Sequence, residues 1–500
     1  MSAISGSDHG KLKPGIRQNK FAESGGAARP ELTRLSRITF GFGAVAGGVT
    51  TGAFDFFLLL FYSQVVGLDA RLVGLAILTA LVFDAISDPI VGYWSDNFRS
   101  RWGRRHPFMY AAAIPVAVSF YFLWTPPETS NQAVLFWYLL ILAVIIRTAL
   151  TFYRTPSSAL IPDLTQDYNK RTGLVSLRYL FAWVGGNALS VLMFFILFPV
   201  FSSDAIPDGR FSRDAYILYG AIGSIVIFAS ILVSSIGTHA HIPHLKSPPP
   251  ARSMSINLIF REIFETLANR SFLALFVAAL IGAIASGLAA GLSLYFFTYF
   301  WGFTDIQTGM VFLGTFVAAV IGFVLAPIVS RTIGKKRGAM IVGLIAFGGA
   351  PLPIVLRLIG ALPPNGTDFI FWFVTITNVV DVGLIICFQI LFASMVADLV
   401  EESELKTGRR SEGVFTAAET FIRKSVQGFG VMAATLVLTL AAFPAGADVE
   451  DVGSDAIWRL GAFYVPMVLT LWLSMIAVIS TYHIDQDVHE ENLRKLSGDH

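Results

Sequence analysis

The sequence FDAISDPIVGYWSDNFRSRWGRRHP, residues 83–107, decides the fold class and points to the function. Its first part closes an apolar run that begins near residue 70, and two aspartates, Asp84 and Asp88, lie inside that run. Its second part is a short and strongly basic loop. A run of about 20 apolar residues is long enough to cross a bilayer as a helix. The stretch therefore predicts a transmembrane helix that carries two acids on one face, because they are four residues apart.

The whole chain has the composition of a polytopic membrane protein. Of its 500 residues, 54% are hydrophobic and 14% are charged, whereas soluble domains carry about 25% charged residues. The apolar runs predict twelve transmembrane helices and an all-α fold. Their ranges are 38–66, 70–96, 106–125, 133–161, 174–201, 214–238, 271–300, 305–331, 338–359, 367–399, 412–443 and 457–481.

Basic residues are divided unequally between the two sets of loops. One set, together with both tails, holds 26 of the 36 lysines and arginines. Because basic loops remain in the cytoplasm, both termini are expected to be cytoplasmic. Residues 1–37 lack the apolar core and cleavage site of a signal peptide, so they are interpreted as a cytoplasmic tail. Residues 483–500 are interpreted as a second tail.

The longest loop, residues 239–270, divides the spans into two groups of six, at 38–238 and 271–482. It contains the Pro-rich stretch HAHIPHLKSPPPARS, which cannot be a continuous helix, and then INLIFREIFETLANR, whose spacing predicts a helix on the membrane surface. The two groups also share a weak repeat, since FYSQVVGLDARLVGLAIL parallels FFTYFWGFTDIQTGMVFL. Repeats in the same orientation occur in major facilitator transporters.

Asp84 and Asp88 have no counterpart in the second repeat, where Gly322 and Ala326 stand at the matching positions. A charge at the bilayer centre costs at least ~2.5–3.5 kcal/mol, and two neighbouring carboxylates disfavour each other's ionisation. The acids are an addition to one half of a common scaffold, which favours a functional role for them.

The fourth span offers partners for these acids. Arg147, Thr151 and Arg154 share one helical face. Three outcomes are open: a hard cation bound by the acids and Thr151, protonation of one or both acids, or pairing with an arginine. A fixed network of aspartate and arginine that only orients the helices is the alternative without function.

Several segments resemble the glycoside–pentoside–hexuronide:cation symporter family, the major facilitator branch that includes the melibiose permease. DAISDPIVGYWSDNFRSRWGRR resembles the family's second helix and following loop, and TFYRTPSSALIPDLTQDYNKRTGLVSLRYLFAWVGG its fourth and fifth helices. MVADLVEESELKTGRRSEGVFTAAETFIRKSVQGFG is similar to its tenth and eleventh. The resemblance implies two six-helix bundles around a central cavity and cation-coupled transport by alternating access. A vertebrate lysophospholipid symporter shares the DAI-x-DP motif, so the family does not define the substrate.

The resemblance also implies a cation site. The family's two acids and its helix-four threonine fall on Asp84, Asp88 and Thr151. An asparagine between the acids is Ser87 here, which leaves the choice among Na⁺, Li⁺ and H⁺ open.

The substrate site departs from the family's pattern. A helix-five arginine at the sugar site matches Arg178, and a helix-eleven lysine matches Lys424. However, two sugar-binding aspartates are replaced by Gly48 and Arg154, and a stacking tryptophan by Ser158. Guanidinium groups bind carboxylate, sulfate or phosphate, so an acidic sugar or another organic anion is favoured over a neutral galactoside.

Arg154 also has a simpler interpretation. Asp55 replaces a tyrosine of the family in the first helix, and Arg154 can pair with this acid instead of binding substrate.

Two charged segments are candidate gates. The loop after the second span contains Asp96, Arg101 and Arg104, which resemble the cytoplasmic signature of major facilitator proteins. Asp398 and Arg409 belong to a second cluster at the end of the tenth span. A role of these basic residues in topology alone is compatible with the same pattern.

No Walker sequence, metal-spaced His/Cys cluster or nucleophile elbow is present in the sequence, so neither ATP-driven transport nor an enzyme is predicted. No cofactor beyond a coupling Na⁺, Li⁺ or H⁺ is expected, and no nucleic acid. The expected state is a monomer among lipids of the bacterial cytoplasmic membrane. The alternatives are a symporter of a lysolipid or other amphipathic anion, an uncoupled carrier with an arginine in the cation site, and a non-transporting sensor or scaffold.

Overall fold

The computed structural model describes residues 32–165, 168–204, 206–244, 270–407, 429–446 and 451–482. In this part of the chain, eleven helices are long and apolar enough to cross a membrane. They are Arg34–Val65, Ala70–Ser95, His106–Leu123, Gln132–Ala159, Gly173–Val200, Arg213–His239, Leu273–Phe300, Asp305–Thr332, Lys335–Leu358, Asp368–Met395 and Ser454–Ser480. A shorter apolar helix, Phe429–Leu440, lies inside the remaining predicted span. The predicted surface helix of the linker and both tails beyond residues 32 and 482 lie outside the described residues.

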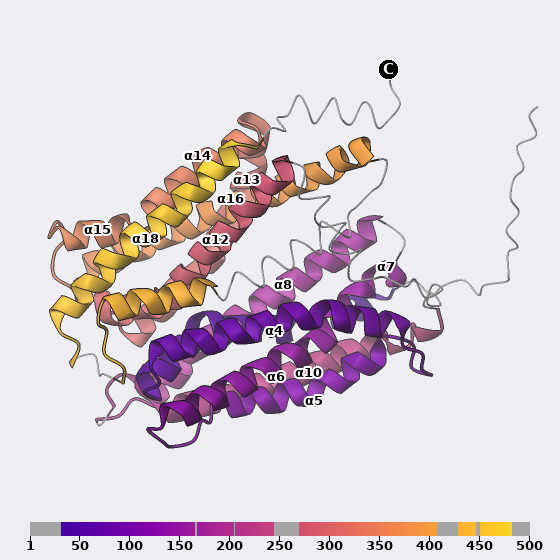
Figure 1. Cartoon of the computed structure of the whole chain (residues 1–500), viewed down its shortest axis with the longest axis horizontal. Helices are drawn as coiled ribbons and strands as arrows, with labels where there is room; N and C mark the ends of the chain where they lie inside the picture. Colours follow the sequence, from indigo (N-terminus) through magenta and orange to yellow (C-terminus); the bar gives the residue numbers. More distant parts are fainter. Residues whose placement is uncertain are drawn as a thin grey trace, which may run out of the picture.

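The N-terminal bundle is built from the first six spans (Figure 1). Helix α4 packs along α6, α6 along α5, α5 along α10, and α2 along α8. Its elements are α1 (Arg34–Phe42), α2 (Ala44–Gly52), η1 (Ala53–Phe57), α3 (Leu58–Leu60), η2 (Phe61–Val65), α4 (Ala70–Asn97), α5 (His106–Leu123), α6 (Gln132–Ala159), α7 (Ile161–Leu164), α8 (Tyr168–Leu192), η3 (Met193–Leu197), α9 (Phe198–Val200), η4 (Gly209–Phe211), α10 (Arg213–His239) and η5 (Ile242–His244).

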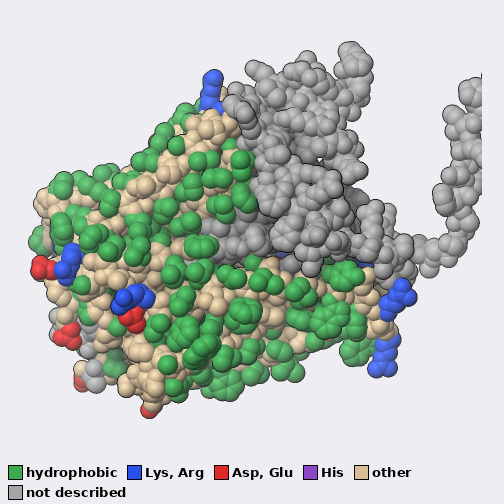
Figure 2. Space-filling view, in the orientation of Figure 1, with side chains coloured by type: hydrophobic (Ala, Val, Ile, Leu, Met, Phe, Trp, Pro, Cys, Tyr) green, Lys and Arg blue, Asp and Glu red, His purple; other side chains and the backbone are tan. Residues whose placement is uncertain are grey.

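The C-terminal bundle lies beside it (Figure 1). Helix α16 packs between α13 and α14, and α12 packs along α18. Its elements are α12 (Arg270–Tyr295), η6 (Phe296–Phe300), α13 (Asp305–Thr332), α14 (Lys335–Gly349), α15 (Leu352–Leu358), α16 (Asp368–Thr407) and α18 (Ser454–Ser480). Figure 2 shows hydrophobic side chains over the visible flanks of both bundles, with charged ones mainly at the ends, as expected for helices that face lipid.

The predicted internal repeat is confirmed by backbone geometry. The first helix of each bundle ends in a π-helical turn, η2 or η6, and a glycine with positive φ follows, Gly67 at 82° or Gly302 at 64°. The residue after each of these glycines makes an equivalent hydrogen bond of 2.8 Å back to the turn. The Leu68 N–H donates to the Tyr62 carbonyl, and the Phe303 N–H donates to the Phe297 carbonyl. One local structure is therefore encoded twice.

The bundles meet through aromatic side chains near one end of the molecule. We call this the far end; it carries the loops at 201–212, 301–304 and 441–446. Phe312 of α13 packs against Phe56 and Phe194 of the N-terminal bundle, with ring centroids 5.2 and 5.1 Å apart. Trp183 of α8 and Phe316 of α13 add an edge-to-face pair at 4.6 Å. The near end carries the basic loop at 98–105.

Helices α2 and α8 touch backbone to backbone at Gly48. A Cβ placed on Gly48 would lie 1.8 Å from the carbonyl oxygen of Ala182, and one placed on Gly186 would lie 2.7 Å from the carbonyl oxygen of Gly48. No side chain fits between these helices at position 48. The aspartate that the resembling family has at this position is therefore excluded by the packing.

We expect Gly48→Ala to lower the free energy of unfolding by about 1–3 kcal/mol, the usual cost of overpacking. Thermal unfolding in detergent measures this as a lower Tm. Gly47→Ala is the matched control, because its Cβ would only make an ordinary 3.8 Å contact with Arg154 Nε. Equal Tm values for the two variants would contradict the close helix packing.

Candidate cation and anion site

The two acids of α4 converge on one hydroxyl of α6. The Thr151 hydroxyl oxygen lies 2.7 Å from Asp84 Oδ1 and 2.9 Å from Asp88 Oδ1. Asp84 and Thr151 are buried, and Asp88 is half-buried. The close packing of α4 along α6 creates this arrangement. The structure thus brings together three of the four residues predicted to bind a cation.

One hydroxyl proton cannot satisfy both carboxylates at the same time. Thr151 can donate to Asp84 or to Asp88, and the other oxygen contact then needs a proton on the acid or a cation nearby. Two carboxylates this close also repel each other when both are ionised. The arrangement is therefore suited to take up one positive charge.

Ser87 is the fourth predicted cation ligand, and its hydroxyl is directed elsewhere. It donates to the backbone carbonyl of Asp84 at 3.0 Å, inside its own helix. Its role as a ligand stays a prediction.

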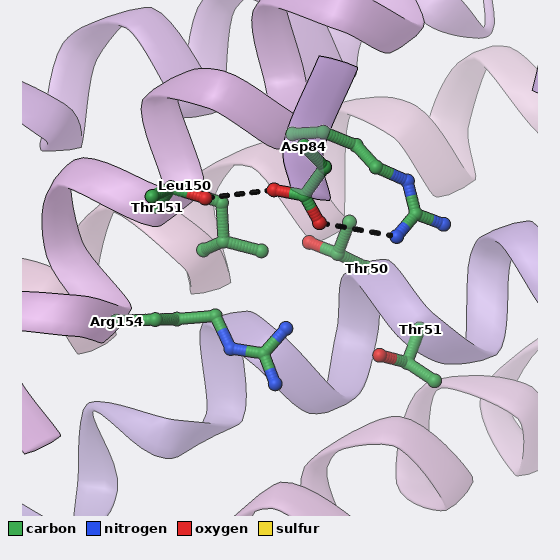
Figure 3. Close-up of a pocket in the computed structure, with 7 residues that line it drawn as sticks. Thr50, Thr51, Asp84, Leu150, Thr151 and Arg154 are labelled. Carbon is green, nitrogen blue, oxygen red and sulfur yellow. Dashed lines mark hydrogen bonds and ion pairs between the residues drawn. The ribbon is translucent and has the colours of Figure 1, made fainter. Parts of the chain in front are cut away.

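A polar hollow lies beside the acids, between α2, α4 and α6. The space free of protein atoms is about 290 Å³ when the adjoining open space is included, and the part that the centre of a water molecule can occupy is about 10 Å³. Figure 3 shows Arg154 reaching into it from α6, opposite Asp84. The lining residues are Thr50, Thr51, Asp84, Arg147, Leu150, Thr151 and Arg154. Two arginines and three threonines around one acid give this hollow a polar lining in which basic groups outnumber the acid.

Arg147 lines this hollow, is largely buried, and makes few polar contacts with the described residues. Its Nη1 lies 3.9 Å from Asp84 Oδ2, which is an ion pair but too long for a hydrogen bond. Its guanidinium lies over the Phe54 ring at 4.6 Å, and its Nε is buried without a hydrogen-bond partner. At an effective dielectric constant near 20, an ion pair at this distance is worth about 4 kcal/mol before the cost of desolvation.

The predicted substrate residues Arg154, Arg178 and Asp55 come from three different elements of the N-terminal bundle. Arg154 lines the hollow, whereas Arg178 of α8 lies over the Phe40 ring at 5.4 Å and has a buried Nη1 without a partner. Asp55 is half-buried in η1. Lys424 lies outside the described residues. The predicted pair of Arg154 with Asp55 stays a prediction.

At the near end, Arg104 forms an ion pair of 2.9 Å with Asp163 of α7. The neighbouring Arg105 contacts the same carboxylate and the Ala159 carbonyl, and all three charged side chains are largely buried. These contacts hold the basic loop against the end of α6. Asp163 was not singled out from the sequence; its position directly after the fourth span was the available signal.

The other predicted gate residues are less informative. Arg101 is exposed and lies over the Trp102 ring at 5.7 Å. Asp96 and Asp398 lie in α4 and α16, but their side chains are not described, and Arg409 lies outside the described residues. Their roles as gates stay predictions.

At the far end, Arg210 joins the two bundles. Its side chain is 3% exposed. Within the N-terminal bundle it pairs with Asp208 at 2.6 Å; across the interface it pairs with Asp305 of α13 at 3.1 Å and donates to the Phe303 carbonyl at 2.7 Å. Burial opposes ionisation of Asp208, but hydrogen bonds and charge from Arg210 outweigh it, so the pKa of Asp208 is lowered.

A second set of polar contacts closes the same end. Gln64 donates to Tyr295 of α12 at 3.3 Å and to the Pro444 carbonyl at 3.2 Å, and the Gly446 N–H donates to the Ser63 carbonyl at 2.9 Å. The two bundles are therefore fastened to each other at the far end by ionic and neutral hydrogen bonds.

Comparison with known proteins identifies the family to which the chain belongs. The model of a family described as MFS/sugar transport protein, where MFS denotes the major facilitator superfamily, matches residues 39–486. The chain belongs to this family. The match confirms the predicted major facilitator fold and the resemblance to the glycoside and cation symporters, and it confirms that the chain is a multi-pass membrane transporter rather than an enzyme.

Individual relatives are distant. The chain is 25% identical to an isoprimeverose transporter of Lactiplantibacillus pentosus, over 86% of this chain and 84% of that protein. It is 24% identical to the sodium-dependent lysophosphatidylcholine symporter 1 of Gallus gallus, over 97% and 93%. The crystal structure of the nucleoside transporter NupG covers 89% of this chain with a TM-score of 0.57 at 12% identity, which supports the fold alone.

We expect Arg210→Gln to loosen the far end, because it leaves the buried Asp208 and Asp305 without their shared partner; breaking a buried pair costs about 3–5 kcal/mol. Hydrogen–deuterium exchange should become faster in both the 208–212 and the 301–304 segments. Arg213→Gln is the control, since the polar contacts of Arg213 with described residues are with Pro126 and Glu128 of its own bundle. Faster exchange in 208–212 alone would show that Arg210 does not hold the bundles together.

Proposed function

We propose that this protein is a cation-coupled symporter that carries a glycoside or acidic sugar across a bacterial cytoplasmic membrane by alternating access. The observation that carries the proposal is the convergence of Asp84 and Asp88 on the Thr151 hydroxyl, beside a hollow lined with arginine. The family supplies the class of transporter, and this geometry supplies the argument for coupling.

The cation is bound by Asp84, Asp88 and Thr151. A Na⁺ or Li⁺ ion would take carboxylate and hydroxyl oxygens, which are the ligands that hard cations prefer. A proton would instead reside on one of the two carboxylates and release the conflict at the shared hydroxyl. In either case the charge of the acids is reduced before the loaded carrier reorients within the membrane.

The substrate binds next to the cation, within reach of Arg154, Arg178 and Lys424. The basic side chains favour a carboxylate-bearing sugar, since a guanidinium binds a carboxylate through two parallel hydrogen bonds. The hydroxyls of Thr50 and Thr51 line the same hollow and suit the hydroxyl groups of a sugar. A sugar held in this way would lie near the middle of the membrane, as in other major facilitator transporters.

Alternating access assigns a role to each end of the molecule. The positive-inside distribution of basic residues supports a cytoplasmic near end and an extracellular far end. The contacts of Arg210 and Gln64 would then belong to the closed extracellular side. The ion pairs of Arg104 and Arg105 with Asp163 would fix the cytoplasmic loop.

An uncoupled carrier is the second candidate, and the position of Arg147 favours it. Arg147 lies 3.9 Å from Asp84, so a guanidinium already supplies positive charge at the acidic pair. If it satisfied the acids permanently, uptake would be indifferent to Na⁺ and to pH.

A lysolipid or another amphipathic anion is the alternative substrate, and the likeness to the lysophosphatidylcholine symporter favours it. Competition assays separate the two classes. Long-chain anions should inhibit uptake if the lysolipid alternative is right, whereas acidic sugars should inhibit it if our proposal is right.

We expect Na⁺, Li⁺ or protons to stabilise the purified protein in a saturable manner. Asp88→Asn should abolish this stabilisation, and Thr151→Val should weaken it about tenfold or more, because hydrogen bonds and contacts to charged groups are worth ~1.5–3 kcal/mol. Thermal stability measured during titration with Na⁺, with Li⁺ and with pH tests this. Thr79→Val is the control, since the Thr79 hydroxyl donates only to the Leu75 carbonyl of its own helix.

The outcomes separate the candidates. A response to Na⁺ or Li⁺ that needs Asp88 supports metal-ion coupling, and a response to pH alone that needs Asp88 supports proton coupling. A wild-type protein that ignores all three cations would reject the symport proposal and support the uncoupled carrier.

A further inference from the structure

Arg147 is the feature that the proposed cation and substrate sites leave unexplained. It is a buried arginine that makes no hydrogen bond to any described residue, although a guanidinium carries five N–H donors. Buried polar groups normally have partners, and a group without one requires an explanation. Its one ion pair, with Asp84, is longer than a hydrogen bond.

The position of Arg147 gives it two possible partners. One is Asp84, whose second oxygen contacts the shared hydroxyl of Thr151. The other is an anion in the hollow, which Asp84 and Arg147 both line and where Arg147 and Arg154 stand two helical turns apart on the same face of α6. The guanidinium also lies over the Phe54 ring in a cation–π contact at 4.6 Å.

Charge decides which partner Arg147 takes. While Asp84 is ionised, it attracts the guanidinium and weakens the attraction of Arg147 for an incoming anion. A cation or proton at Asp84 and Asp88 cancels that attraction and leaves Asp55 as the remaining acid whose charge acts on Arg147. The guanidinium then gains more from an anion in the hollow, because a buried charge is costly unless it is fully paired. Cation binding and anion binding then strengthen each other by the same factor, as linkage requires.

We propose that Arg147 is an internal substitute for the coupling cation at Asp84, and that cation binding releases it to bind a carboxylate in the hollow formed with Arg154, Thr50 and Thr51. This inference rests on the proposed symport function, which it extends by naming the residue that links cation to substrate. It predicts that Arg147 opposes cation binding when no anion is present and favours it when an anion is present.

The test uses two variants of the full-length protein, Arg147→Gln and Arg147→Lys. Apparent affinities for Na⁺, Li⁺ and protons are measured by thermal stability, alone and with saturating D-glucuronate, with D-glucose as the neutral counterpart. Arg147→Gln removes the competing charge, so cation affinity without anion should rise about tenfold. Arg147→Lys keeps the charge but lacks the planar fork, so cation affinity without anion should stay near that of the wild type.

Glucuronate tests the second half of the inference. In the wild type it should raise cation affinity about tenfold, within the usual range of coupling between two sites, and glucose should not. Both variants should lose most of this effect. Arg459→Gln is the matched control, because Arg459 also has a buried Nε without a partner but lies on α18 of the other bundle.

Each outcome of these titrations supports or rejects a stated part of the inference. If wild type binds the cation through Asp84 but Arg147→Gln leaves that affinity unchanged, the inference is wrong and the symport proposal stands. If only Arg147→Gln responds to cations, the arginine occupies the site permanently; it is then a substitute cation that is never released, so coupling and the release step are both rejected. If glucuronate acts equally on wild type and Arg147→Lys, or on neither, the carboxylate role is rejected.

Discussion

Two carboxylates that share one hydroxyl inside a membrane are the constraint on which the rest of this protein depends. Asp84 and Asp88 cannot both be ionised and satisfied by Thr151 alone, because the hydroxyl carries a single proton. A proton, a metal ion or a guanidinium can each resolve this conflict. Each of these partners corresponds to a different mode of transport: a proton symporter, a sodium symporter or an uncoupled carrier. The positive group bound at Asp84 and Asp88 therefore distinguishes the three.

The contacts between the bundles lie apart from the acidic pair, which limits how a bound cation can affect the arrangement of the bundles. Among the described residues, those that form the acidic pair and line the hollow belong to helices α2, α4 and α6 of the N-terminal bundle. The links to the other bundle lie at the far end, where Arg210 joins Asp208 to Asp305. A cation at Asp84 therefore makes no direct contact with these described links at the far end. It changes the charge of one bundle, and the substrate must contribute the contacts that favour a different arrangement of the two.

Much of the fold followed from the sequence because apolar runs are local. Most of the described helices end within a few residues of the predicted spans. The convergence of Asp84 and Asp88 on Thr151 was also predictable, because helical spacing puts the two acids on one face and the family resemblance places the helix-four threonine beside them. The contacts of Asp163 and Arg210 were not predictable in this way. Asp163 meets Arg104 across 59 residues, and Arg210 meets Asp305 across two bundles, so both pairs depend on helix packing rather than on any local pattern. The incomplete bonding of Arg147 is likewise a property of its surroundings, which residue identity alone does not reveal.

The packing of α2 against α8 also explains why the family's sugar site cannot be transferred unchanged. Because Gly48 touches the Ala182 carbonyl, no acidic side chain can project from position 48 to accept hydrogen bonds from a sugar. Two and three residues further along, Thr50 and Thr51 line the hollow that Arg147 and Arg154 face from α6. The first helix thus offers hydroxyl groups where the family has a carboxylate, and the fourth offers guanidinium groups. Hydroxyls can donate or accept hydrogen bonds, whereas guanidinium groups only donate. The side chains of this site therefore favour our proposal of an anionic substrate over a neutral sugar held by carboxylate acceptors.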